Sequence, residues 1–113
     1  TAGWMRVGAD VCADVIRSGR DFILASRAEP GSIAYDWTID PLEPGKMHVF
    51  EEWESEEALG RHFKDDSYLR MKAHLETSGI TAFSINIYRS DRSEPVYPAD
   101  GSQRTEIFGV SIA

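Results

Sequence analysis

The stretch between residues 26 and 62 constrains the fold most, because a helix end, two strands and a helix start follow one another closely in it. Pro30-Gly31 ends the first helix, since proline disfavours helical geometry in the preceding residue and glycine can adopt a left-handed turn. Alternating residues at 32–38 and 46–54 predict the strands of a hairpin. Ser55, followed by acidic residues, predicts the cap of the next helix. This span is too short to be a domain alone, so it indicates part of a larger α+β unit.

The N-terminal part predicts a strand near residues 3–8 and a helix over about 10–28, capped by Asp10. Strand and helix periodicities overlap here, and a later helix start capped by Asp14 is the alternative. Gly19 falls inside this helix, where glycine costs about 1 kcal/mol relative to alanine. We therefore expect another group to pack closely over Gly19.

The rest of the chain completes the pattern. It predicts a short helix near 66–77, a strand over 80–89, a polar turn-rich segment over 90–103 and a fifth strand over 105–112. The order β-α-β-β-α-β is that of a ferredoxin-like unit, an antiparallel sheet with helices on one face. We expect one domain over residues 1–113, with 90–113 a C-terminal extension that ends in an extra strand.

Length and composition exclude several classes of protein. The chain has 113 residues, enough for one domain and too few for two cores of useful volume. Its net charge of −7 argues against nucleic-acid and anionic-membrane surfaces, which need clustered Lys and Arg. No apolar run has membrane-spanning length, and no Cys/His spacing resembles a zinc site. The one cysteine, Cys12, cannot form an internal disulfide, which is consistent with a reducing compartment. We therefore expect a soluble cytoplasmic protein, and we expect no bound metal.

Four residues carry a family resemblance: Tyr35, Glu51, Trp53 and His62. In the antibiotic biosynthesis monooxygenase family, Tyr35 matches a tyrosine and Trp53 matches a tryptophan. Glu51 matches the acidic residue two positions before that tryptophan, and His62 matches the histidine nine positions after it. Over roughly residues 5–90 the chain resembles this family of dimeric α+β barrels, which includes cofactor-free quinol and anthrone oxygenases. The resemblance implies a homodimer in which two sheets share a barrel and the fifth strand reaches the partner.

The predicted sheet also points to a dimer. Tyr35, Trp37 and Phe83 fall on its strands, and only two principal helical segments are available to cover it. Such a sheet has more apolar surface than one layer of helices can bury. We therefore expect its other face to pack against a second copy of the chain.

The leading functional hypothesis is an oxidoreductase, a cofactor-independent monooxygenase that oxidises a quinol, an anthrone or a similar electron-rich aromatic with O2. Such a molecule, once deprotonated, can itself donate an electron to O2, so the protein needs a dry pocket, a base and hydrogen bonds to the oxyanion. No cofactor is expected, in line with the lack of a nucleotide fingerprint. His62 is the expected base, on the apolar side of its helix. Glu51 is the second catalytic candidate, because burial would raise its pKa.

Four residues are the expected contacts of the substrate: Tyr35 and Asn86 as polar groups, and Trp37 and Trp53 as walls. Aromatic groups with a polar tip suit a flat polycyclic ligand, but they suit a dimer interface equally well.

The candidate residues also have structural explanations. Trp53 can hold the second helix on the sheet, where truncating a buried tryptophan costs about 3–5 kcal/mol. Glu51 can pair with an Arg or a His, and His62 can be a core histidine hydrogen-bonded to Glu51.

Other functions remain open. One is a dimeric small-molecule binding or stress-response protein without turnover. Another is isomerase-like handling of a sugar phosphate, which needs converging Arg or Lys side chains. His74 resembles the proximal histidine of the haem-degrading branch, but that branch also uses an asparagine on the first strand, and residues 1–11 contain none. A solvated His74 at the surface is therefore the favoured interpretation.

Overall fold

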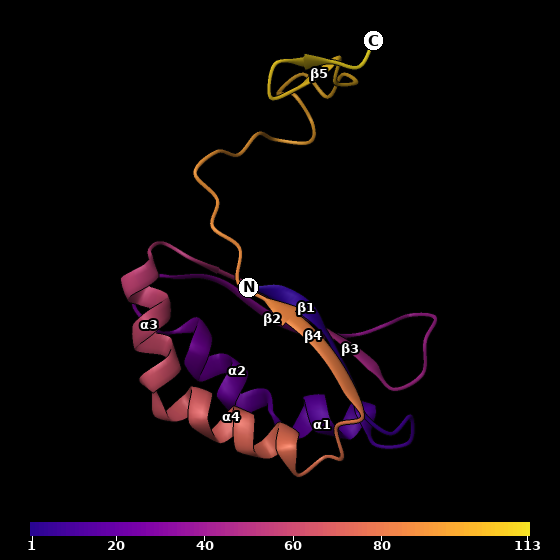
Figure 1. The fold of residues 1–113 in the computed structure, drawn as a ribbon, viewed down its shortest axis with the longest axis vertical. Coiled ribbons are helices and arrows are strands. Elements are labelled where there is room, and N and C mark those ends of the chain that lie inside the picture. The colour runs from indigo at the N-terminus through magenta and orange to yellow at the C-terminus, as the bar shows by residue number, and fades with distance from the viewer.

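A computed structural model describes residues 1–113 and shows a four-stranded antiparallel sheet with helices on one face (Figure 1). The elements of the body are β1 (Ala2–Arg6), α1 (Cys12–Ser18), α2 (Arg20–Arg27), β2 (Ser32–Ile39), β3 (Lys46–Trp53), α3 (Glu56–Lys64), α4 (Asp66–Glu76) and β4 (Ala82–Asn86). The strands lie in the order β2-β3-β1-β4. With each helical segment split in two, this is the β-α-β-β-α-β arrangement of a ferredoxin-like unit. The predicted α+β fold class is confirmed.

The pairing register assigns strand residues to the two faces of the sheet. Tyr35 lies opposite Glu51, Trp37 opposite Val49, and Phe83 opposite Met5. Directly opposed residues in an antiparallel pair share a face, and Met5 and Val49 are buried beneath the helices. Tyr35, Trp37 and Phe83 therefore lie on the face that the helices cover, and the apolar surface that they contribute is not on the opposite face. The sequence shows that alternate residues of each strand point to opposite faces of the sheet, but it does not show which set faces the helices.

The face without helices carries a mixed surface. Trp4 lies there, with the Lys46 ammonium 5.2 Å and the Arg6 guanidinium 5.9 Å from its ring centroid. Phe50, on the next strand, is 50% exposed. This face combines charged side chains with two large aromatic ones.

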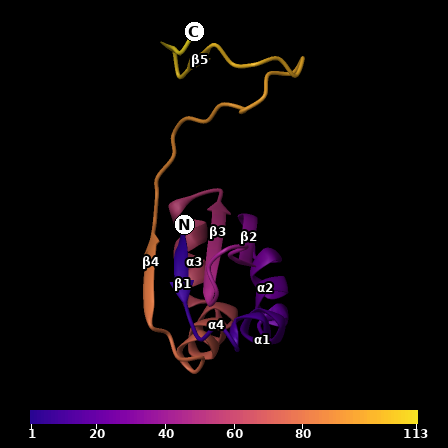
Figure 2. The same ribbon diagram turned by 90° about the vertical axis from the view of Figure 1, so that its right-hand side faces the viewer.

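The core lies between the sheet and the helices. Its buried cluster consists of Met5, Val7, Cys12, Val15, Met47, Met71 and Leu75. α1 and α2 lie toward the β2 edge of the sheet, and β4 forms the opposite edge, against which no helix packs closely (Figure 2). The layer of helices is therefore incomplete at β4.

The first helical segment differs from its prediction. It is two helices that meet at Gly19, and the residue before α1 is Val11, which provides no side-chain cap. A turn closed by the Val11 N–H and the Gly8 carbonyl (3.1 Å) occupies the residues before α1, so neither Asp10 nor Asp14 caps it. The expected close packing over Gly19 is confirmed, because a Cβ there would lie 3.1 Å from the Met71 side chain.

The start of the second helical segment is as predicted. The Ser55 hydroxyl accepts a hydrogen bond from the Ala58 N–H at 3.1 Å and caps α3. The chain then breaks at Asp65, whose carboxylate accepts from the Ser67 N–H at 2.9 Å and caps α4. Each of these two helices therefore begins at a local side-chain cap, and the Asp65 cap lies at the junction between α3 and α4.

The C-terminal extension leaves the body beside the N-terminus, where Asn86 pairs with Ala2 (Figures 1 and 2). It ends in a small hairpin of β5 (Glu106–Ile107) and β6 (Val110–Ser111), where one strand over 105–112 was predicted. The prediction of a single strand is wrong, because the chain reverses direction at Phe108 and Gly109, which have φ angles of 46° and 84°. β4 is likewise shorter than the predicted 80–89.

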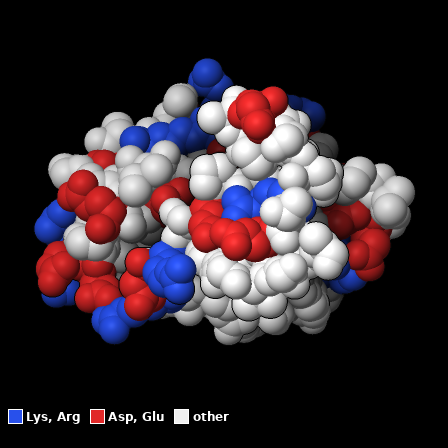
Figure 3. Space-filling model, turned by 90° about the horizontal axis from the view of Figure 1, so that it is seen from above, with Lys and Arg blue, Asp and Glu red and all other residues white.

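Side chains within the extension hold its hairpin together. Arg104 pairs with Glu94, whose carboxylate also accepts from the Phe108 N–H at 3.0 Å. Several apolar side chains of this segment are exposed: Val96, Tyr97, Ile107, Phe108, Val110 and Ile112. Viewed from the side of the extension, uncharged side chains cover a wide area between scattered charges (Figure 3).

Candidate functional site

A cavity of about 580 Å³ lies between the helix-covered face of the sheet and α4. Most of its wall is apolar and includes Met5, Val49, Met71, Leu75, Phe83 and Ile85. Its volume is within the range of about 300–1,000 Å³ that is typical of small-molecule pockets. Phe83 on β4 is 69% exposed, so the cavity is least enclosed along this edge strand.

Tyr35 supplies a phenol at the polar part of this wall. Its side chain is buried, and its hydroxyl oxygen accepts a hydrogen bond from the Trp37 indole N–H at 3.1 Å. Both residues come from β2 and point to the same side of the sheet, because they are two positions apart. Burial raises the pKa of Tyr35 to about 12, so its hydroxyl keeps its proton at neutral pH and can donate it in a hydrogen bond.

Glu51 supplies a carboxyl group next to this phenol, from the facing position on β3. Its Oε1 accepts from the Trp53 indole N–H at 3.0 Å and lies 3.5 Å from His62 Nε2. No hydrogen bond within the chain uses Oε2, so that oxygen is available to a ligand. Burial raises the pKa of the Glu51 carboxyl, against the opposing effects of the Trp53 hydrogen bond and of His62.

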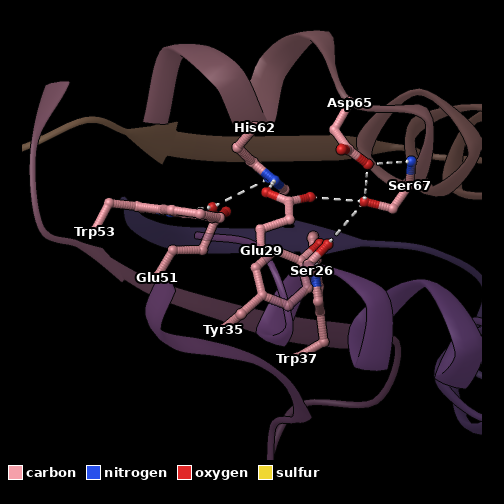
Figure 4. Close-up of polar contacts among 9 residues, drawn as sticks. All are labelled: Ser26, Glu29, Tyr35, Trp37, Glu51, Trp53, His62, Asp65 and Ser67. Carbon is pink, nitrogen blue, oxygen red and sulfur yellow. Dashed lines mark hydrogen bonds and ion pairs between the residues drawn. The ribbon is translucent and has the colours of Figure 1, made fainter. Parts of the chain in front are cut away.

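His62 lies behind Glu51, with 1% of its surface exposed. Its Nδ1 is 2.8 Å from Glu29 Oε2, and the Trp53 ring packs against the imidazole with 4.5 Å between centroids. The other oxygen of Glu29 accepts from the Ser67 hydroxyl at 2.8 Å. Figure 4 shows this imidazole between the Glu51 and Glu29 carboxyls. The site thus has a cavity-facing layer and a buried layer behind it.

The predicted site residues divide between these layers. Four of them line the cavity: Tyr35, Trp37, Glu51 and Asn86. Asn86 is at the end of β4 and in register with Ala2, so it alternates with the inward-facing Ile85 and borders the cavity at its rim. His62 and Trp53 do not line the cavity, and they contact Glu51 from behind. The hydrogen-bond partner of His62 is Glu29, in place of the expected Glu51.

The sequence interpretation missed Glu29 and Ser67. One signal pointed to Glu29: it follows the C-terminal end of α2, where the helix dipole disfavours a negative charge. A carboxylate at the C-terminal end of a helix therefore indicates a hydrogen-bonding or ionic partner in another part of the chain. Ser67 gave no such signal, because a serine at the start of a helix is common for local reasons.

His74 is half-buried and does not line the cavity. Its Nε2 is 2.9 Å from the Val15 carbonyl oxygen near the end of α1, and its ring lies 6.0 Å from that of Phe22. The expectation of a solvated surface histidine holds only in part, because α4 packs this side chain against α1 and α2 and leaves it half-buried. No three His, Cys, Asp or Glu side chains gather in a way that could hold a metal ion. None of the helices has the length and apolar character needed to cross a membrane.

Solved structures of known proteins share this fold. A Deinococcus radiodurans protein, provisionally assigned as an antibiotic biosynthesis monooxygenase, superposes with a TM-score of 0.76 at 20% identity, over 86% of this chain and 96% of that chain. A conserved protein from Methanosarcina mazei gives a TM-score of 0.71 at 22% identity, over 80% and 89% of the two chains. At these identities the likeness establishes the fold alone.

The sequence itself also matches known proteins. An uncharacterised Synechocystis protein is 36% identical over 63 residues, which are 56% of this chain and 43% of that protein. The chain thus matches less than half the length of that relative. The model of the antibiotic biosynthesis monooxygenase family matches residues 5–74, which is more than half of the chain. The chain belongs to the antibiotic biosynthesis monooxygenase family.

Proposed function

We propose that the protein is a cofactor-independent monooxygenase that oxidises an electron-rich aromatic, such as an anthrone or a quinol, with O2. The observation that carries this proposal is the Glu51 carboxyl, placed with one free oxygen on the wall of a largely apolar cavity beside the Tyr35 phenol. A base and a hydrogen-bond donor on the wall of a largely apolar cavity are the groups that this reaction needs.

The reaction with an anthrone can be written with all atoms balanced. The ionised Glu51 carboxylate removes a proton from the reactive methylene, and the resulting carbanion donates one electron to O2. The ligand radical and superoxide combine into a peroxide, which takes the proton back from the Glu51 carboxylic acid. Loss of water, with the second methylene hydrogen, leaves a ketone. One O2 thus converts CH2 into C=O and H2O.

Tyr35 and Glu51 have complementary tasks in this scheme. Because burial keeps Tyr35 protonated, its hydroxyl can donate to the oxyanion that develops on the aromatic ligand. Because burial raises the pKa of Glu51, its carboxylate is a stronger base than an exposed one. Trp37 and the apolar wall provide surface for a flat ring system.

His62 acts behind Glu51 in this proposal. The imidazole was the expected base, but at 1% exposure it has no direct access to a ligand in the cavity. Its Nε2 is 3.5 Å from Glu51 Oε1, close enough to exchange a proton after a small side-chain movement. Glu51 therefore takes the direct role and His62 supports it.

Oxygen uptake with anthrone, under air and under argon, tests this function. Glu51→Gln keeps the side-chain shape and removes the base, so we expect a loss of about a hundredfold or more, in the usual range of general-base catalysis. Glu57→Gln is the matched control, because Glu57 is exposed in the first turn of α3 and lies outside the site. Tight ligand binding without any oxygen-dependent rate, for anthrone and menadiol alike, would instead assign the protein as a binding module.

We also propose that the protein works as a homodimer. The sheet face with Trp4 and Phe50 has no covering layer, and the C-terminal extension exposes six large apolar side chains away from the body. A soluble monomer rarely exposes apolar surface on this scale. Light scattering of the full chain at micromolar concentration should give twice the mass of one chain. A mass of one chain would contradict the homodimer, and it would leave the proposed oxygenase reaction unaffected.

A further inference from the structure

We propose that Glu29 is a positioning residue of this site: its carboxylate holds the His62 imidazole as the Nδ1–H tautomer, so that Nε2 faces Glu51 and shares a proton with it. The kinetic part of this inference rests on the proposed function, whereas the tautomer does not. Figure 4 shows the His62 imidazole with a contact to the carboxyl group of Glu29 and another to that of Glu51.

The contacts of Glu29 decide which nitrogen carries the proton. An ionised carboxylate only accepts hydrogen bonds, and Glu29 Oε2 lies 2.8 Å from His62 Nδ1. With Glu29 ionised, the hydrogen between them sits on Nδ1. The Ser67 hydroxyl lies 2.8 Å from Glu29 Oε1 and 2.8 Å from Asp65 Oδ1, and its one hydrogen is shared between these two acceptors, so the second oxygen of Glu29 also has a partner.

The second nitrogen of His62 then has one partner within reach. Nε2 is fully buried and makes no hydrogen bond, and Glu51 Oε1 lies 3.5 Å away. A buried polar nitrogen without a partner is costly, and a proton placed between Nε2 and Oε1 removes that cost. This proton resides either on Glu51, with a neutral imidazole, or on His62, with an ionised Glu51.

Both arrangements have the same total charge, which makes the exchange easy. In each of them Glu29 is ionised, Nδ1 carries a hydrogen, and one further proton lies between Glu51 and His62. The other ionisable groups near the pair are the Thr1 ammonium, which donates to the Glu51 carbonyl oxygen at 3.0 Å, Asp65, which lies beyond Ser67, and the phenols of Tyr35 and Tyr68, whose rings lie 5.6 Å and 5.1 Å from the imidazole. No lysine or arginine forms an ion pair with Glu29 or Glu51, and the Thr1 ammonium favours the arrangement in which Glu51 is ionised.

The arrangement lets Glu51 accept a proton from a ligand and return it later, within the site. In the arrangement with an ionised Glu51 and a protonated His62, Glu51 Oε2 takes the proton of the ligand while the shared proton stays at Nε2, and Glu29 stabilises the imidazolium through Nδ1–H. When the peroxide forms, the same proton returns through Glu51. Oxidation of the ligand then needs no exchange of protons with bulk water while the cavity is occupied.

The tautomer can be measured without a substrate, by ¹⁵N NMR of the imidazole nitrogens in protein labelled at histidine. The chain has three histidines, so His48→Gln and His74→Gln assign the His62 signals. In the wild-type protein we expect Nδ1 to show the shift of a protonated nitrogen throughout the pH range of the folded state. A wild-type His62 with a bare Nδ1 and a protonated Nε2 would overturn the inference.

Glu29→Gln tests the cause. Its amide can either donate to Nδ1 or accept from it, so the constraint is lost and the Nε2–H tautomer, paired with the Glu51 carboxylate, should become populated. Ser67→Ala removes one anchor of Glu29 but keeps its charge, so the Nδ1–H tautomer should persist. Glu57→Gln, a change of equal charge on the same helix as His62, should leave the spectrum unchanged. An unaltered tautomer in a folded Glu29→Gln protein contradicts the inference.

Kinetics separate this inference from the proposed function. With anthrone as the probe, Glu29→Gln should lower kcat by about tenfold or more and leave KM within about twofold, because the cavity wall is intact. Equal kcat values for Glu29→Gln and Glu57→Gln would contradict the positioning role. If the protein oxidises neither anthrone nor menadiol, the oxygenase function fails, and the NMR tautomer still decides the role of Glu29.

Discussion

Gly31 connects the fold to the site, and its replacement by alanine gives a prediction whose size follows from the structure. Gly31 has a φ of +86°, a left-handed conformation that L residues rarely adopt. A Cβ there would also lie 2.5 Å from the Ala58 Cβ, far inside contact distance. Ala58 is buried on α3, one turn before His62, so the helix that carries the imidazole must move.

Two costs add in Gly31→Ala. The left-handed backbone costs an alanine roughly 1–2 kcal/mol, and the forced displacement of a packed helix costs about 1–3 kcal/mol. We expect the free energy of unfolding to fall by about 2–5 kcal/mol. Gly79→Ala is the matched control, because Gly79 has a φ of +78° but a Cβ there would meet no other group within 4 Å. It should lose only the backbone part, about 1–2 kcal/mol.

Urea unfolding, followed by circular dichroism with tryptophan fluorescence as a second probe, measures both variants. The difference between them isolates the contact between Gly31 and Ala58. Gly31→Ala should also lower the rate of anthrone oxidation at temperatures where the protein is fully folded, because His62 is displaced, and Gly79→Ala should not. Equal destabilisation by the two substitutions would show that the contact has no energetic weight and would refute the reasoning.

The remaining predictions concern single side chains. Burial raises the pKa of Glu51 in the folded state, so the stabilising contribution of this carboxyl is present below its unfolded-state pKa and is lost as the pH rises through its folded-state pKa. Glu51→Gln should therefore become increasingly stable relative to wild type as the pH rises. Urea unfolding at a series of pH values measures this difference. Tyr35→Phe leaves the Trp37 indole N–H without its acceptor and should cost about 1–3 kcal/mol of stability, measured by urea unfolding, with Tyr97→Phe as the exposed control. Met47→Ala empties a fully buried core position and should cost about 2–5 kcal/mol in the same assay.

Local patterns made much of the fold predictable. Ser55 caps α3 through a hydrogen bond to a residue three positions away, so the helix start can be predicted from a few neighbouring residues. The alternation in β2 and β3 and the stop at Pro30-Gly31 are similarly local signals. Family resemblance was needed to recognise Glu51, Trp53 and His62 as a group, because a strand and a helix bring them together.

The errors arose where distant parts of the chain decide the structure. The alternation of β2 is the same whichever face the helices cover, so Tyr35 and Trp37 could not be assigned to a face. α4 determines the surroundings of His74, which packs against α1 and is half-buried. The turn at Phe108 and Gly109 was missed because apolar residues on both sides of it imitate a single strand.

The proton chemistry of the site depends on contacts that short-range patterns do not contain. Glu29 is 33 positions from His62 and 38 from Ser67 in the sequence, and these residues meet only because α2, α3 and α4 pack on the same face of the sheet. A change in the packing of any of these helices alters the distance from His62 to Glu29 or to Glu51. Stability and proton transfer are therefore coupled in this protein, and variants such as Gly31→Ala should impair turnover although they replace no residue of the cavity wall.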